Sequence, residues 1–339
     1  MNYQRIRSIS FAILCLGIAL GGCSSNKSDI KNGGENMSDV VQFESKLKFE
    51  TDSAMHFIRH QVELGPRVPG TEAHRKCEEY IVRKMNIFGA DTIIEQKGTV
   101  TAFTGDILPF NNILARFNTS APRRILLAAH YDTRPWADNE TDEKHRKTPI
   151  LGANDGGSGV GVLMELARIA GENDLPIGVD FLFVDVEDYG NSDGWGNADD
   201  TWCLGSQYWA QNHPYTIDEL PDFGIVLDMV GGTNARFHRE YYSDKTARSI
   251  VDKVWGAAKN IGLSEVFINE LGGSIIDDHI QINKTGIPCI DIVECNNAVT
   301  RTFPPTWHTL HDNMASIDSK SIKAVGTTVL NVIEKEAAK

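Results

Sequence analysis

The sequence has 339 residues and a formal net charge of −13, and no basic cluster in it could follow a phosphate backbone. This charge pattern argues against nucleic acid as a partner. About 290 residues remain after the N-terminal segments described next, a length that one α/β domain often reaches.

The N-terminus has the layout of a signal peptide. Two arginines precede a short apolar run over residues 9–20, too short for a stable membrane span. The run ends in Leu20-Gly21-Gly22-Cys23, which resembles a bacterial lipobox. The resemblance implies cleavage before Cys23, lipidation of its thiol, and a place in the bacterial cell envelope facing the periplasm or the surface. The alternative is an ordinary signal peptide followed by an incidental cysteine.

Three segments follow from this pattern. Residues 1–22 are predicted as a lipoprotein signal peptide. Residues 23–45 are rich in Ser, Asn, Lys, Asp and Gly and are predicted as a flexible tether. Residues 46–339 contain no second linker and no internal repeat, so they are predicted as one folded domain. The lipid anchor is expected to be its only link to the membrane.

Helix and strand patterns then alternate. Apolar residues at helical spacing predict helices around residues 55–62, from an N-cap at Thr71 to Gly89, and over 159–170, 247–258 and 322–333. Short apolar or alternating runs predict strands over 92–96, 112–117, 124–129, 179–185, 223–229 and 288–293. Several of these runs read as buried strands of a parallel sheet. The predicted fold is therefore α/β: one domain with a mixed, mostly parallel central sheet and helices on both faces.

Polar side chains gather just after the predicted strands. The set consists of His130, Asp132, Asp155, Glu187, Asp188, Asp228 and His308. In open α/β sheets ligands bind in the crevice beyond the carboxyl ends of the strands, so these groups are expected to meet there. Each of them alone also has an ordinary structural explanation, such as a helix cap, a solvated loop or a paired core histidine.

Charge balance suggests what this set binds. Several carboxylates in one crevice repel each other, and no Arg or Lys cluster nearby offsets them. A divalent cation would, and carboxylate with imidazole ligands suits zinc. Of the adjacent Glu187 and Asp188, one can bind the metal while the other faces the substrate as a general base. Asp155 lies in a Gly-rich loop that allows close backbone approach.

The same residues carry a family resemblance. His130-Tyr131-Asp132, the Gly152–Asp155 loop, the Glu187-Asp188 pair, the Asp228–Gly232 run and His308 resemble the zinc aminopeptidase superfamily. Within it, the Asp277–Ile280, Gly286–Pro288 and Phe303–Thr309 segments resemble glutaminyl cyclases, and the Trp307-His308 pair is the sharper indication. The resemblance extends from about residue 50 to the C-terminus.

The resemblance implies a role for each matching residue. One zinc ion per chain would be held by Asp155, Asp188 and His308. Glu187 would be the general acid and base, with Asp228 and Asp277 completing a carboxylate network. Trp307 would line the substrate pocket, with Trp195 or Trp202 as a second wall. Plain core packing is the alternative for these tryptophans, and it applies more to Trp202 than to Trp307. Two positions depart from the vertebrate enzymes, which have Glu where this chain has Asp188 and His where it has Asp291, so no role is assigned to Asp291.

The reaction so implied is cyclisation of N-terminal Gln in peptides or exported proteins to pyroglutamate, with release of ammonia, by a monomeric catalytic domain. The nearest alternative is a zinc aminopeptidase, in which His130 and Asp228 hold a second metal bridged by Asp155 and in which Glu187 activates water. His130 and Asp132 are therefore assigned either to a supporting role or to that second metal. A non-catalytic peptide-binding lipoprotein is the third possibility.

The cysteines give no zinc-finger pattern. Cys15 leaves with the signal peptide, and Cys77, Cys203, Cys289 and Cys295 lack Cys-x-x-Cys spacing. Each is expected to be a small buried residue. The oxidising compartment permits a disulfide among them, but the sequence does not place one.

Overall fold

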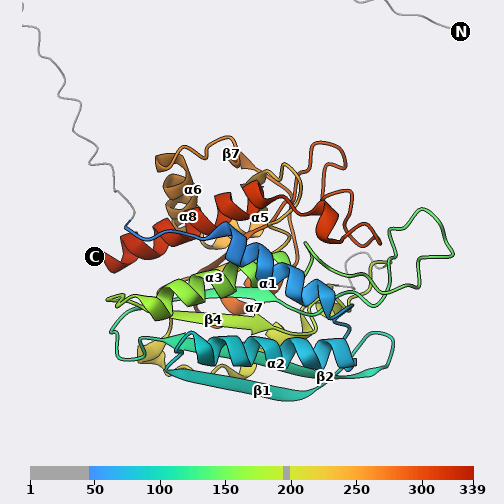
Figure 1. Cartoon of the computed structure of the whole chain (residues 1–339), viewed down its shortest axis with the longest axis horizontal. Coiled ribbons are helices and arrows are strands. Elements are labelled where there is room, and N and C mark those ends of the chain that lie inside the picture. The colour runs from blue at the N-terminus through green and yellow to red at the C-terminus, as the bar shows by residue number, and fades with distance from the viewer. Residues whose placement is uncertain (1–45, 194–198) are drawn as a thin grey trace, which may run out of the picture. The chain divides into compact units, whose positions relative to one another are not determined.

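Within residues 46–193 and 199–339, which the computed structural model describes, six strands form one central sheet (Figure 1). They are β1 (Thr92–Thr101), β2 (Ile107–Phe117), β3 (Arg124–His130), β4 (Gly178–Val184), β5 (Gly224–Leu227) and β8 (Cys289–Ile292). Their order across the sheet is β1-β2-β4-β3-β5-β8. The pairs β4–β3, β3–β5 and β5–β8 are parallel, whereas β1–β2 and β2–β4 are antiparallel. The prediction of a mixed, mostly parallel sheet is confirmed.

Helices cover both faces of this sheet. Along β3, Ile125 and Leu127 enter one apolar cluster, while Leu126 and Ala128 enter another on the opposite face. The first cluster is covered by α1 (Thr51–Glu63), α2 (Glu72–Ile87), α3 (Ser158–Glu172), α6 (Arg248–Asn260) and α8 (Ser319–Ala337). The second is covered by α4 (Leu204–Asn212) and α7 (Asp278–Asn283). In Figure 1, α1, α2 and α3 lie on the viewer's side of the sheet.

Local signals set the start of α2, as predicted at Thr71, and the ends of both α1 and α2. The Thr71 side chain accepts a hydrogen bond from the His74 amide, which caps the start of α2. Gly89 follows the end of α2 with φ +84°, and Gly65 follows α1 with φ +96°. Glycine adopts this left-handed conformation without steric cost, so both positions end a helix cleanly.

Several short elements do not appear in the sequence pattern. They are β6 (Phe237–Arg239), β7 (Phe267–Leu271), α5 (Tyr241–Thr246) and the 3₁₀ turns η1 (Asp199–Thr201), η2 (Ile217–Glu219) and η3 (Met314–Ser316), together with α4 and α7. Strands β6 and β7 pair with each other in a separate two-stranded sheet. Such elements are too short for hydrophobic periodicity to identify them.

Helix α3 packs unusually close to the sheet, at Gly159. A Cβ atom at this position would lie 2.0 Å from the Leu227 carbonyl oxygen and 2.9 Å from the Ala129 Cβ. Only glycine permits this approach, because any side chain would overlap the backbone of β5. The contact fixes the start of α3, and with it the preceding loop that carries Asp155, against the carboxyl end of the sheet.

The four cysteines of the domain are buried, as predicted. Cys77, Cys203, Cys289 and Cys295 are all buried and free, as small core residues. Among the described residues, none of the helices combines the length and the apolar character that crossing a membrane requires. The predicted signal peptide, the tether and Cys23 lie outside the described residues.

Candidate active site

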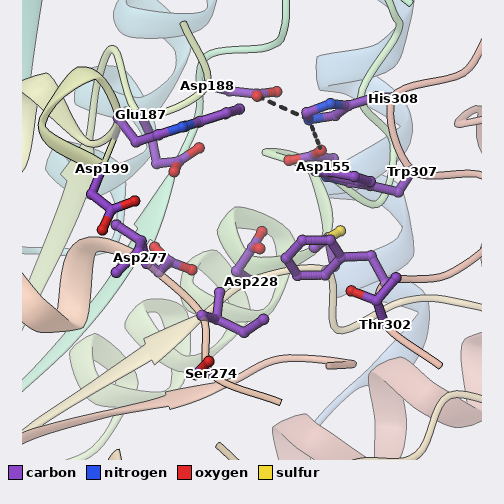
Figure 2. Close-up of a pocket in the computed structure, with 15 residues that line it drawn as sticks. Asp155, Glu187, Asp188, Asp199, Asp228, Ser274, Asp277, Thr302, Trp307 and His308 are labelled. Atoms are coloured by element: carbon purple, nitrogen blue, oxygen red, sulfur yellow. Dashed lines mark ion pairs between the residues drawn. The ribbon is translucent and has the colours of Figure 1, made fainter. Parts of the chain in front are cut away.

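One pocket, of about 250 Å³, lies beyond the carboxyl ends of the parallel strands. His130 ends β3, the Glu187-Asp188 pair follows β4, and Asp228 follows β5. The pocket is lined by Asp155, Glu187, Asp188, Asp199, Trp202, Asp228, Met229, Ser274, Ile275, Ile276, Asp277, Thr302, Phe303, Trp307 and His308. In Figure 2, Glu187, Asp199 and Asp277 lie on the side opposite His308 and Trp307. Most of the sequence-predicted polar residues therefore meet in one place.

Asp155, Asp188 and His308 form a group with the composition of a metal site. Their ligand atoms all lie within 4.8 Å of one another. His308 Nε2 is 3.1 Å from Asp188 Oδ1 and 3.6 Å from Asp155 Oδ2 (Figure 2). All three residues are buried, and the second oxygen of Asp188 and Oδ2 of Asp155 have no hydrogen-bond partner. Buried, unpartnered carboxylate oxygens facing an imidazole fit a zinc ion.

The second ring nitrogen of His308, Nδ1, faces a residue that the sequence did not indicate. Asp138 Oδ1 lies 3.1 Å from His308 Nδ1, the carboxylate–histidine arrangement that orients metal ligands in proteins. Arg134, fully buried, donates to Asp138 through Nε at 2.9 Å and lies 3.5 Å from Asp188 Oδ1. Burial would raise the pKa of Asp138, but its contacts with His308 and Arg134 lower it far below the ordinary value.

A second cluster of possible metal ligands includes Asp155 as well. His130 Nε2 lies 3.2 Å from Asp155 Oδ1 and 3.1 Å from Asp228 Oδ1, and all three residues are buried. His130 Nδ1 faces Asp132 at 3.5 Å. Asp132 itself is fully buried and does not line the pocket. This second group has the donor composition that a second metal would need.

Glu187 stands at the pocket edge beside the first group. The Cys203 thiol donates to Glu187 Oε1 at 3.4 Å. Burial raises the pKa of Glu187 well above its ordinary value; the charge of His130 opposes this, and the carboxylate of Asp277 adds to it. A carboxyl group with a raised pKa is suited to both accept and return a proton near neutral pH.

Asp277 extends the acidic side of the pocket. Burial raises its pKa to about 6, and the neighbouring Asp228 carboxylate contributes to the same shift. Behind it, Asp291 is fully buried on β8, where burial and Asp277 raise its pKa strongly. Its position behind the pocket separates Asp291 from any substrate. Glu187, Asp228 and Asp277 thus lie as neighbouring carboxyl groups at the pocket.

Aromatic rings form the wall next to His308. The Trp307 ring stacks on the His308 imidazole with centroids 3.9 Å apart, and the Trp202 ring stacks on it at 6.1 Å. Phe303 packs against Trp307 at 4.4 Å. Trp202 therefore lines the pocket together with Trp307. Trp195 lies outside the described residues.

The backbone around the site is held in an uncommon conformation. Val186, Cys203, Met229 and His308 all have φ between +47° and +59°. Side chains other than glycine seldom adopt this left-handed region, and residues that do so cluster at functional sites. Met229 and His308 line the pocket, Val186 directly precedes Glu187, and Cys203 contacts Glu187. Such a backbone persists only when its surroundings fix it.

A buried network supports the turn before Glu187. Asp185 accepts hydrogen bonds from His74 Nε2 at 2.7 Å, from the Tyr131 hydroxyl at 2.8 Å and from the Val186 amide at 2.8 Å. Burial would lower the pKa of His74, but Asp185 and, more weakly, Glu78 raise it to about 10. The imidazole is therefore charged, and the network is a buried ion pair behind the site.

Comparison with known proteins agrees with this architecture. The model of peptidase family M28 matches residues 112–333, and the chain belongs to that family. A crystal structure of Bacteroides thetaiotaomicron glutaminyl cyclase is 47% identical, with a TM-score of 0.81 over 85% of this chain and 98% of that one. Another, of a leucine aminopeptidase precursor from the same species, is also 47% identical, with a TM-score of 0.80 over the same shares. The glutaminyl-peptide cyclotransferase of Drosophila melanogaster is 25% identical over 75% of this chain and 73% of its own length.

Proposed function

We propose that this protein is a zinc-dependent glutaminyl cyclase, which converts N-terminal Gln of peptides and exported proteins to pyroglutamate and ammonia. The observation that carries the proposal is the stacking of Trp307 and Trp202 on the metal-site residue His308, in the pocket that Glu187 also lines. A flat aromatic wall beside a metal site suits the planar side-chain amide of Gln. The cyclase names of the similar proteins support it.

The reaction is intramolecular. The free α-amine nitrogen of the substrate attacks its own side-chain amide carbon, so one C–N bond forms while the bond to the departing ammonia breaks. Asp155, Asp188 and His308 would hold one zinc ion, which would polarise the amide carbonyl and stabilise negative charge on its oxygen. The pocket walls hold amine and carbonyl in attack geometry and exclude water.

Glu187 moves the proton. Its carboxylate takes a proton from the attacking amine and returns it to the departing nitrogen, so that ammonia leaves as a neutral molecule. The raised pKa of Glu187 suits it to both halves of this transfer. The neighbouring Asp277 carboxyl group adds to this raised pKa of Glu187, which favours proton retention between the two steps.

The test uses purified full-length protein whose zinc content is measured. It is incubated in parallel with a Gln-initiated and a Leu-initiated peptide, and the products are analysed by mass spectrometry. Loss of ammonia from the first peptide, an intact second peptide and about one zinc per chain are expected. Glu187→Gln is the matched variant: it should retain its zinc and lose activity by about 100- to 10,000-fold.

The aminopeptidase remains the alternative, because His130, Asp155 and Asp228 form a second group able to hold a metal. In that enzyme two metals would share Asp155, and Glu187 would activate water. Two metals per chain together with release of Leu from the second peptide would establish this function instead. Peptide binding that is unaffected by a chelator, with neither product formed, would establish a non-catalytic binder.

We also propose that the chain is a monomeric enzyme anchored in the cell envelope by a lipid on Cys23, facing the periplasm or the surface. The support is the order of charged, apolar and small residues before this cysteine. Cys23→Ser should leave the chain unlipidated and shift it from the membrane to the soluble fraction. A variant that stays in the membrane fraction would contradict the anchor, and light scattering of purified protein tests the monomer.

A further inference from the structure

Asp312 is a buried carboxylate four residues after His308. It is 1% exposed and lines no part of the pocket. Its Oδ1 accepts a hydrogen bond from the Asn154 amide at 2.8 Å, and its Oδ2 accepts one from the Asp155 amide at 3.0 Å. Its carbonyl oxygen also accepts from the Ala153 amide. One residue of the late loop thus binds three successive amides of the Gly-rich loop.

These amides lie where the chain has no regular structure to satisfy them. The loop precedes α3, so its N–H groups need partners from elsewhere. Arg67 fixes the loop from the other side by donating to the carbonyl oxygens of Leu151 and Gly152. The backbone that carries Asp155 is therefore clamped between the buried Arg67 guanidinium and the buried Asp312 carboxyl group.

The second carboxylate of the metal group is held in the same way. Asp132, also fully buried, accepts from the amides of Glu187 and Asp188, each at 3.1 Å. In both places two consecutive N–H groups bind the two oxygens of one carboxylate, and the second residue of each pair belongs to the metal group. Because the same arrangement occurs at two metal-group residues, we infer that Asp312 does more than fill space in the core.

We propose that Asp312 is a positioning residue for the metal site. It sets the backbone of Asp155 and ties that backbone to the loop that supplies His308. The two residues then reach the metal from loops that are locked to each other, so zinc binding and docking of the late loop are coupled. The inference rests on the proposed site at Asp155, Asp188 and His308.

The test is zinc affinity, measured by chelator competition on the purified full-length protein. Asp312→Asn keeps the shape but replaces one acceptor oxygen by a donor, so one amide loses its partner. We expect its zinc Kd to be weakened by about 10- to 100-fold, with activity restored at saturating zinc. Asp312→Glu, which keeps both acceptors, should recover part of this loss.

The matched control is Asp180→Asn. Asp180 is equally buried and paired with Arg124 and Tyr215, but it lies near the amino end of β4, away from the pocket. This variant should lower the unfolding midpoint and leave the zinc Kd unchanged. Equal zinc affinity of Asp312→Asn and wild type would overturn the inference, and so would equal weakening in the control. Wild-type protein that binds no zinc would overturn the proposed function as well.

Hydrogen exchange of the wild type gives a second readout, independent of any variant's folding. Removal of zinc should speed amide exchange in residues 151–156 and 308–312 together. Faster exchange in only one of these segments would contradict the coupling.

Discussion

Substitution of Gly159 by alanine tests how closely the site depends on the packing of α3. The added Cβ would lie 2.0 Å from the Leu227 carbonyl oxygen, whereas real Cβ atoms essentially never come closer than 3.0 Å. Helix and strand must therefore separate by about 1 Å, because neither backbone atom can rotate away. Such overpacking costs about 1–3 kcal/mol, and the better helix propensity of alanine returns about 0.5–1 kcal/mol of it. We expect a net loss of up to about 2.5 kcal/mol.

The same shift should reach the chemistry. Asp155 lies four residues before Gly159, and a misplacement of about 1 Å at a catalytic site can lower the rate about 100-fold. The assays are urea unfolding and the rate of pyroglutamate formation. Gly256→Ala on α6 is the control, because no atom lies within 4 Å of its added Cβ; it should gain about 0.5–1 kcal/mol and keep full activity. A Gly159→Ala variant as stable and as active as that control would refute the reasoning.

Three further predictions follow from the groups around the pocket. The pKa of His74 is about 10 in the folded protein against an ordinary 6.5, so its stabilisation is complete below pH 6.5 and is lost as the pH rises through 10. The unfolding free energy should fall over this window in denaturant titrations, and His74→Gln should flatten that fall; an unchanged slope would count against the buried ion pair. Asp138→Asn removes the carboxylate beside His308 Nδ1 and should weaken the zinc Kd about 10-fold in chelator competition. An unchanged Kd would contradict the orienting role of Asp138. Trp202→Ala removes part of the pocket wall and should raise KM for a Gln-initiated peptide more than it lowers kcat. Unchanged steady-state kinetics would indicate that this ring only packs against its neighbours.

The strands that carry the site can be predicted from the sequence because of their environment. All seven residues of β3 and all seven of β4 are buried, since helices cover both faces, and this produces the continuous apolar runs that mark parallel strands. By contrast, β7 buries only Phe267. Helix α7 is only six residues long, and three of its four buried residues are polar. Neither leaves a periodic pattern, because tertiary contacts, not local preference, determine these elements.

The site residues also fall into those that the sequence predicts and those that it does not. Asp155, Asp188 and Asp228 are predictable because they directly follow strands or precede a helix, and the topology brings those ends together. Asp138 and Asp312 were missed because each acts on a loop far away in the sequence, through contacts that no local pattern encodes. Only the three-dimensional docking of the loops reveals such residues.

The residues with left-handed backbone conformation at the pocket also indicate which part of the protein can be stabilised against heat. Relaxing the backbone at Val186 or Met229 with glycine would remove strain and, at the same time, loosen the segments that aim Glu187 and Asp228. At the β1 edge of the sheet, no residue of β1 has this strained backbone conformation. There β1 is an edge strand with its side chains half-buried or exposed, and none of its residues lines the pocket. Thermostabilising changes therefore belong on that border, where they leave the chemistry untouched.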